Sequence, residues 1–286
     1  MNPAAALLRL HAAVALFGAA ALFGRWVGLP ATSIVLARTA FAALALTTAA
    51  AASGRRAMPG RPTLALAVNG ALLAFHWVAF FAAVQRTSVA IALVGYASFP
   101  LFVVLFERAE GGQGGRGGWA GRVGVAALVV AGLLLTVPSF APGDRGAQGL
   151  LLGVLSGLAF AILVLRNRSL VARFEPLTIA LWQNLAAAVF LVPVVLVTPG
   201  SRVPTAADWM LLIVLGVACT ALAHTLFIAS MRRVSAHTAS VVAALEPVYG
   251  IAFAGVLLAE IPSVRTLAGT ALIVVAAVVA SRDAIR

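Results

Sequence analysis

The sequence predicts an all-α integral membrane protein whose ten transmembrane helices form two inverted five-helix repeats around a central cavity. Three observations carry this prediction: a very apolar composition, ten long apolar runs, and a similarity between the two halves of the chain. Of the 286 residues, 63% are hydrophobic and 10% are charged, and the mean hydropathy is +1.07. Water-soluble domains are about half apolar and a quarter charged, so this composition excludes a soluble enzyme, a disordered segment and a disulfide-rich secreted module.

The net charge of +12 does not indicate a nucleic-acid partner. All 20 basic residues are arginines, and they lie in small groups between the apolar runs rather than on one basic face. A nucleic-acid-binding surface needs such a face or a recognised binding motif. Cys219 is the only cysteine, so no disulfide can form within the chain. The charge is better explained as a set of topology signals.

Ten apolar stretches are long enough to cross the hydrocarbon core as helices, which takes about 20 residues. They span residues 8–24, 31–52, 64–84, 88–106, 119–137, 149–165, 177–197, 209–230, 236–258 and 265–281. The first stretch is followed by Arg25 and by no polar mature domain, so we expect it to remain as a helix rather than to be cleaved as a signal peptide. The short connections carry Gly, Pro, Arg and Asp and leave no room for a second domain.

The arginines predict the orientation of the chain. With the N-terminus in the cytoplasm, 14 arginines fall on the cytoplasmic side and 5 on the other, and Arg38 lies inside a span. Cytoplasmic loops carry the excess of positive charge in membrane proteins. Both termini are therefore expected in the cytoplasm.

The two halves of the chain resemble each other at matching spans. Residues 88–100 of the fourth span align without gaps with residues 235–247 of the ninth, at a shift of 147. Residues 32–38 of the second span align with 177–183 of the seventh, at a shift of 145. These shifts are close to 143, which is half of the chain length.

We therefore expect two five-helix units, residues 1–143 and 144–286, that form one transport unit. Because five is odd, the second unit enters the membrane from the opposite side. Many secondary transporters use this inverted arrangement to alternate access to a site near the bilayer midplane.

Several segments of the second half resemble the ten-helix, EamA-type members of the drug/metabolite transporter superfamily. They are residues 216–224, 230–237, the 243–249 stretch with its Glu-Pro pair, and 257–260, which ends in Glu260. In the first half, Arg38 and the Phe-Pro pair at 99–100 fit the same family, and the fourth span is similar to amino-acid and metabolite exporters, including the aromatic amino-acid type. One departure is Gln113, where the resemblance leads us to expect Glu. The resemblance implies a cavity lined by spans one, three, four, six, eight and nine, and transport in the direction of export.

Arg38 and Glu246 are the clearest ionisable residues within the predicted spans, where a charge is costly unless it is paired or faces water. Glu246 is interpreted in three ways: as a proton carrier, as a ligand for a substrate ammonium group, or as a structural partner of Arg38 or of nearby backbone donors. Arg38 either clamps a substrate carboxylate or serves a structural or gating role. Its counterpart in the second half is the neutral Gln183, which argues against an essential charge at both positions.

Pro100 and Pro247 occupy matching places in the fourth and ninth spans. A proline inside a helix removes a backbone hydrogen bond, and such breaks are tolerated where neighbours or a water-lined cavity satisfy the freed group. Both prolines are hinge or cavity-wall candidates, and the alternative is a static kink.

Aromatic and histidine side chains recur on shared helix faces and are the candidates for lining the cavity. They are Phe17, His76, Trp77, Phe80, Tyr96, Phe99, Phe160, His224 and Phe227. A cavity lined by aromatics and a few polar groups suits an amphipathic or aromatic solute. The alternative is simple packing or lipid contact, which we favour for Phe81 and Phe106. Neither His76 nor His224 has the further ligands that a metal site needs.

The function that we expect from the sequence is export of aromatic or hydrophobic amino acids and related metabolites across a bacterial inner membrane, by alternating access. We expect a monomer that uses no cofactor and binds no nucleic acid. The alternative is a proton-coupled exporter of lipophilic or quaternary cationic drugs. A membrane enzyme or scaffold is disfavoured because the sequence offers no Ser/His/Asp set, paired carboxylates or metal cluster.

Overall fold

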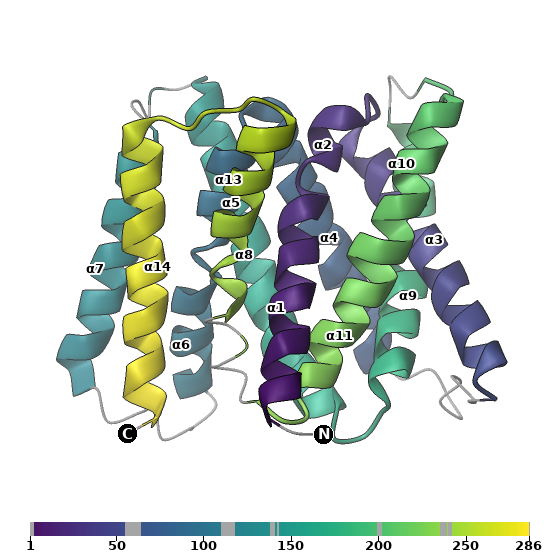
Figure 1. Ribbon diagram of the computed structural model, residues 1–286, viewed down its shortest axis with the longest axis horizontal. Coiled ribbons are helices and arrows are strands. Elements are labelled where there is room, and N and C mark those ends of the chain that lie inside the picture. Colours follow the sequence, from purple (N-terminus) through teal and green to yellow (C-terminus); the bar gives the residue numbers. More distant parts are fainter. Residues whose placement is uncertain are drawn as a thin grey trace.

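The computed structural model describes residues 3–54, 64–109, 118–137, 141, 143–198, 202–234, 239 and 242–285, and within these every regular element is a helix (Figure 1). The α-helices are α1 (Pro3–Ala20), α2 (Phe23–Trp26), α3 (Ala31–Ala52), α4 (Leu64–Arg86), α5 (Val89–Tyr96), α6 (Phe99–Ala109), α7 (Gly118–Thr136), α8 (Arg145–Leu170), α9 (Pro176–Val197), α10 (Ala206–Gly216), α11 (Ala223–Ser230), α13 (Glu246–Leu257) and α14 (Val264–Ile285). One π-helical turn, η1 (Val217–Leu222), joins α10 to α11.

The helices confirm the predicted all-α membrane fold. Seven helices in the described residues are long and apolar enough to cross a membrane, and three shorter apolar helices, 123–136, 246–257 and 264–279, supply the fifth, ninth and tenth spans. Three of the predicted spans consist of two or more helical elements each, and the ninth is interrupted by a turn at residues 244–245 before α13. The first consists of α1 and α2, the fourth of α5 and α6, and the eighth of α10, η1 and α11.

The packing of the helices follows the inverted repeat. Helix α1, in the first half of the chain, packs against α11 and α13 of the second half. Its counterpart α8, in the second half, packs against α4 and α5 of the first half. Three pairs of equivalent helices, one from each half of the chain, pack against each other: α3 with α9, α5 with α13, and α7 with α14. The boundary between the two units at residues 143 and 144 stays a prediction.

The two ends of the chain lie at the same end of the helix bundle (Figure 1). An even number of crossings has this result, in agreement with the predicted ten spans. The side of the membrane on which this end lies stays a prediction from the arginine count.

Glycine allows close approach at the two repeat-related crossings. A Cβ atom added to Gly18 of α1 would lie 2.8 Å from the backbone nitrogen of Gly250 in α13. A Cβ atom added to Gly153 of α8 would lie 2.8 Å from the carbonyl oxygen of Ala92 in α5. Gly153 and Gly157, four residues apart on α8, therefore serve close packing within the chain.

A short segment closes one end of the bundle. The first span breaks after α1, and residues 22–29, which include α2, fold over the helix ends with Leu22, Phe23, Val27 and Leu29 buried. Arg25 forms an ion pair with Glu260, 2.9 Å from nitrogen to oxygen. Backbone carbonyls of the segment accept hydrogen bonds from Gln85 and Arg202, at 2.8 and 3.1 Å. Three distant parts of the chain thus hold this segment in place.

Candidate central binding site

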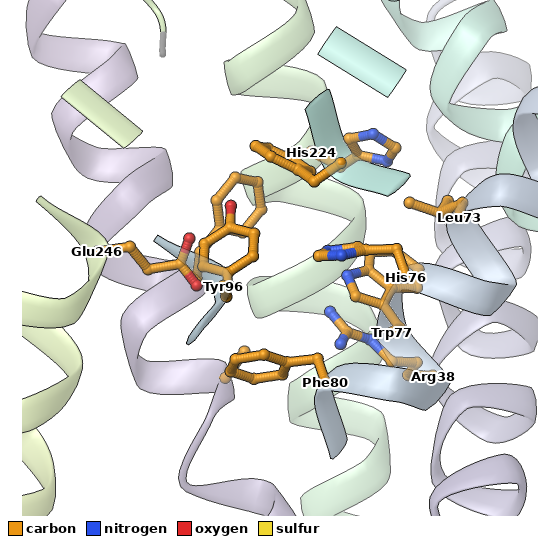
Figure 2. Close-up of a pocket in the computed structure, with 11 residues that line it drawn as sticks. Arg38, Leu73, His76, Trp77, Phe80, Tyr96, His224 and Glu246 are labelled. Atoms are coloured by element: carbon orange, nitrogen blue, oxygen red, sulfur yellow. The ribbon is translucent and has the colours of Figure 1, made fainter. Parts of the chain in front are cut away.

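A cavity lies between the helices of both repeats and has a volume of about 30 Å³, room for about two water molecules. Its walls come from α1, α3, α4, α5, α8, α11 and α13 (Figure 2). The lining residues are Phe17, Ala20, Arg38, Leu73, His76, Trp77, Phe80, Tyr96, Phe160, His224 and Glu246. Residues that lie more than 200 positions apart in the sequence therefore meet around one small space.

Most of the residues predicted from the sequence to bind substrate line this cavity, but two do not. Phe99 and Phe227 are buried one layer behind it. The Phe99 ring packs 5.3 Å from Tyr96, and the Phe227 ring packs 5.7 Å from Phe17, measured between ring centroids. Both rings therefore support the cavity wall rather than form it. The missed lining residues, Ala20 and Leu73, are small or aliphatic and give no signal in an apolar span.

The aromatic side chains form one connected cluster. The His76 ring lies 5.1 Å from Phe160, 5.5 Å from Tyr96 and 6.2 Å from Trp77. Trp77 in turn meets His224 edge to face at 6.0 Å. Offset and edge-to-face pairs at these distances are the favoured arrangements of aromatic rings. The cavity wall is thus apolar over most of its area and carries a few fixed polar atoms.

Arg38 enters the cavity from α3 although it is only 2% exposed. Its Nε donates a hydrogen bond to the Thr220 hydroxyl at 3.0 Å, and its guanidinium carbon lies 3.8 Å from the centre of the Trp77 ring. A cation over an indole face is stabilised by the ring quadrupole. The ring of Phe81, interpreted above as packing, lies 5.3 Å away and is fully buried.

Thr220 owes its position to the π-helical turn. Its hydroxyl donates to the carbonyl oxygen of Leu215, five residues earlier, at 2.7 Å. Such π turns are rare in proteins, and those that do occur are often found at functional sites. Thr220 was not predicted from the sequence, because a lone threonine in an apolar span does not reveal its partner on another helix.

Glu246 is the first residue of α13 and lies across the cavity from Arg38 (Figure 2). The Tyr96 side chain lines the same cavity, and Oε2 of Glu246 has no hydrogen-bond partner in the described part of the chain. The N-terminus of a helix favours a negative charge. No ion pair joins Glu246 to Arg38 among the described residues, so the two side chains face each other across the cavity.

Gln183, the repeat counterpart of Arg38, lies outside the cavity. It is fully buried and donates a hydrogen bond to Asn167, which also accepts from Asn69 at 3.1 Å. Arg166 donates to Asn69 in turn. This polar cluster between α4, α8 and α9 was not predicted, although buried asparagines in apolar spans were its signal in the sequence.

Pro100 and Pro247 each stand second in a new helix rather than inside a continuous one. Pro100 follows Phe99 at the start of α6, and Pro247 follows Glu246 at the start of α13. Proline is well accommodated in the first helical turn, because the backbone N–H groups there have no partner in the helix. The spans are therefore interrupted before each proline, which is a larger break than the predicted kink. Their role as hinges stays a prediction.

The described residues contain no group of three or more His, Cys, Asp or Glu side chains placed to hold a metal ion. The polar atoms of the cavity are instead spread over opposite walls, as in a site for an organic solute.

Comparison with known proteins identifies the chain as a transporter. Residues 147–282 match the EamA-like transporter family. The chain is 29% identical over 265 residues to the pseudopaline exporter CntI of Pseudomonas aeruginosa strain UCBPP-PA14, covering 89% of this chain and 87% of the relative. It is 23% identical over 254 residues to the transporter YxxF of Bacillus subtilis, covering 86% and 79%. A transporter of Archaeoglobus fulgidus is 27% identical over 270 residues, covering 94% and 93%.

A solved crystal structure of another protein has the same fold. It superposes with a TM-score of 0.75 at 21% sequence identity, over 100% of this chain and 99% of the other. This likeness extends over both halves and so supports the ten-helix architecture. The match of residues 147–282 and the relatives named as transporters show that this multi-pass membrane protein is similar to transporters of the EamA-like family.

Proposed function

We propose that this transporter exports amino acids, aromatic or broadly hydrophobic, and related metabolites, by alternating access. The observation that carries the proposal is the placement of one anion and one cation on opposite walls of a single aromatic cavity, Glu246 and Arg38 (Figure 2). An amino acid is a zwitterion with the complementary pair of charges. Its ammonium group would face Glu246, its carboxylate would face Arg38, and its side chain would pack on the aromatic rings.

The size of the cavity supports alternation between states. Pockets that bind small molecules have volumes of about 300–1,000 Å³, far above the 30 Å³ found here. The cavity must therefore widen before a substrate enters. The interrupted spans at α5–α6 and before α13 bring the cavity walls to helix ends, where small backbone changes move a wall without bending a helix.

The proposal includes the direction of transport and the membrane in which the protein lies. A relative is named as an exporter of pseudopaline, which favours export of a small organic solute here. The arginine distribution favours a bacterial inner membrane with both termini in the cytoplasm. The proposal also takes a monomer as the working unit.

A second candidate is a proton-coupled exporter of lipophilic or quaternary cations. It is favoured by one observation: Glu246 is not paired with Arg38 and keeps an unpartnered carboxylate oxygen beside aromatic rings. Aromatic rings and a carboxylate together bind organic cations in many proteins.

Counterflow in proteoliposomes separates the two candidates. Proteoliposomes that contain the purified protein are loaded with a labelled amino acid. Exchange of this amino acid is then measured against a panel of unlabelled amino acids and lipophilic cations outside. We expect exchange with aromatic and hydrophobic amino acids and no exchange with tetraphenylphosphonium. Exchange of the cations alone, driven by an imposed pH gradient, would replace the proposal with the second candidate.

The Glu246→Gln variant tests the role of the carboxylate. Glutamine keeps the size of the side chain and one oxygen acceptor, but it removes the carboxylate. We expect a folded protein whose half-saturating amino-acid concentration rises at least about tenfold, since hydrogen bonds to charged groups contribute about 1.5–3 kcal/mol. Unchanged flux and unchanged pH dependence would remove Glu246 from the mechanism.

A further inference from the structure

Ser156 of α8 fixes the orientation and the protonation of His76. The Nδ1 atom of His76 lies 3.0 Å from the carbonyl oxygen of Ser156 and 2.7 Å from its hydroxyl. A carbonyl oxygen only accepts hydrogen bonds, so we assign the proton of the neutral His76 ring to Nδ1, which then donates to Ser156. The ring is also held on its faces by Phe160 and Tyr96. His76 therefore has one available orientation in the cavity wall.

The second ring nitrogen of His76 is consequently an acceptor. The imidazole is 5% exposed, and no carboxylate in the described residues lies within ion-pair distance of it, so the neutral form is the favoured one. In neutral histidine one nitrogen donates and the other accepts. Because Nδ1 donates to Ser156, Nε2 presents a lone pair, and His76 projects into the cavity (Figure 2).

Glu246 adds a second acceptor on the facing wall. One of its carboxylate oxygens is buried and has no hydrogen-bond partner among the described residues. A buried acceptor without a donor is costly, and the cost is removed when a bound molecule supplies the donor. The Tyr96 side chain packs against His76 and lines the same cavity as Glu246.

We propose that the site selects substrates whose amino group carries N–H bonds, primary or secondary ammonium groups, and rejects their quaternary analogues. Glu246 and His76 each accept one N–H bond of the same ammonium group, and Ser156 acts as a positioning residue that keeps the lone pair of His76 aimed at the substrate. A trimethylated nitrogen keeps its charge but offers no donor, so both acceptors stay unpaired. This inference rests on the proposed function and adds a specificity rule to it.

The test is a methylation series of one amino acid. In proteoliposomes, counterflow of labelled phenylalanine is measured against unlabelled phenylalanine and its N-methyl, N,N-dimethyl and N,N,N-trimethyl derivatives. We expect the trimethyl compound to compete at least about tenfold more weakly than phenylalanine, because it loses both charge-assisted hydrogen bonds. Equal competition by the parent and the trimethyl compound would overturn the inference and leave amino-acid export standing. A protein that exchanges no amino acid would overturn the proposed function instead.

Variants of His76 show whether this residue reads the N–H group. His76→Phe keeps a planar ring for the aromatic cluster and removes the acceptor, so it should reduce the difference between phenylalanine and its trimethyl derivative. His76→Gln restores an acceptor and should restore part of that difference. Phe80→Leu is the matched control, because it changes another lining ring and removes no hydrogen-bond acceptor. It should change the competition by phenylalanine and by all its methylated derivatives by the same factor. A methylation dependence that is unchanged in both His76 variants would contradict the assignment.

Discussion

A buried arginine without an acidic partner among the described residues sets the chemistry of the cavity. Removing a guanidinium from water costs several kcal/mol, so Arg38 must be stabilised by what surrounds it. The Thr220 hydroxyl and the face of Trp77 supply that stabilisation and fix the direction of the charge. The sequence predicted Arg38 and Trp77 because both stand out in an apolar span. It did not predict Thr220 or Ser156, because their roles depend on partners on distant helices.

The Thr220→Val variant tests this view of Arg38. Valine has the shape of threonine but cannot accept the hydrogen bond, so the guanidinium is less firmly held. We expect the half-saturating substrate concentration to rise about tenfold in proteoliposome uptake, with little change in folding. The matched control is Thr225→Val on the same span, since the Thr225 hydroxyl has no hydrogen-bond partner in the described structure. Equal effects of the two variants would contradict the assigned role of Thr220.

Interrupted helices and glycine crossings are the features that shape the cavity at the scale of elements. The sequence predicted nearly all of the spans within a few residues, because a membrane requires long apolar helices. It located the breaks in the fourth and ninth spans through Pro100 and Pro247. It did not predict the break between α1 and α2 or the π turn η1, because no residue type marks them. These breaks arise from packing between helices that are distant in the sequence.

The Gly153→Ala variant tests the crossing of α8 and α5. The added methyl group would lie 2.8 Å from the Ala92 carbonyl oxygen, so the helices must move apart. We expect a loss of about 1–3 kcal/mol in the free energy of unfolding. Gly124→Ala is the matched control, because nothing lies within 4 Å of a Cβ atom there. The buried Cys219, the only cysteine of the chain, reports unfolding by thiol labelling during heating in detergent. Identical melting of both variants would be inconsistent with a tight crossing.

The whole molecule is organised by one two-fold relation between its halves. The alignment of the halves and the alternation of arginines predicted this arrangement, and the packing of α1 with α13 and of α8 with α5 follows it. Side-chain chemistry departs from the symmetry, since Arg38 faces the cavity while Gln183 joins a separate polar cluster. Such departures could not be predicted, because a sequence repeat conserves helix positions more strongly than the polar partners between them.

The orientation of the chain is a prediction for the whole molecule. A fluorescent protein fused to the C-terminus should fluoresce in bacterial cells, and alkaline phosphatase inserted at Gly143 between α7 and α8 should be active. The reason is the 14 to 5 distribution of arginines between the two sides. The opposite pattern, with active phosphatase at the C-terminus, would reverse the orientation and with it the direction assigned to transport.

The most direct test of the account is whether the site requires both charges of an amino acid. Labelled phenylalanine counterflow is measured in competition with phenylalanine, with phenethylamine, which lacks the carboxylate, and with 3-phenylpropionate, which lacks the ammonium group. If Arg38 and Glu246 hold the two ends of the substrate, each analogue should compete at least about tenfold more weakly than phenylalanine. Competition by phenethylamine as strong as that by phenylalanine would show that Arg38 does not bind the carboxylate, and would contradict the account.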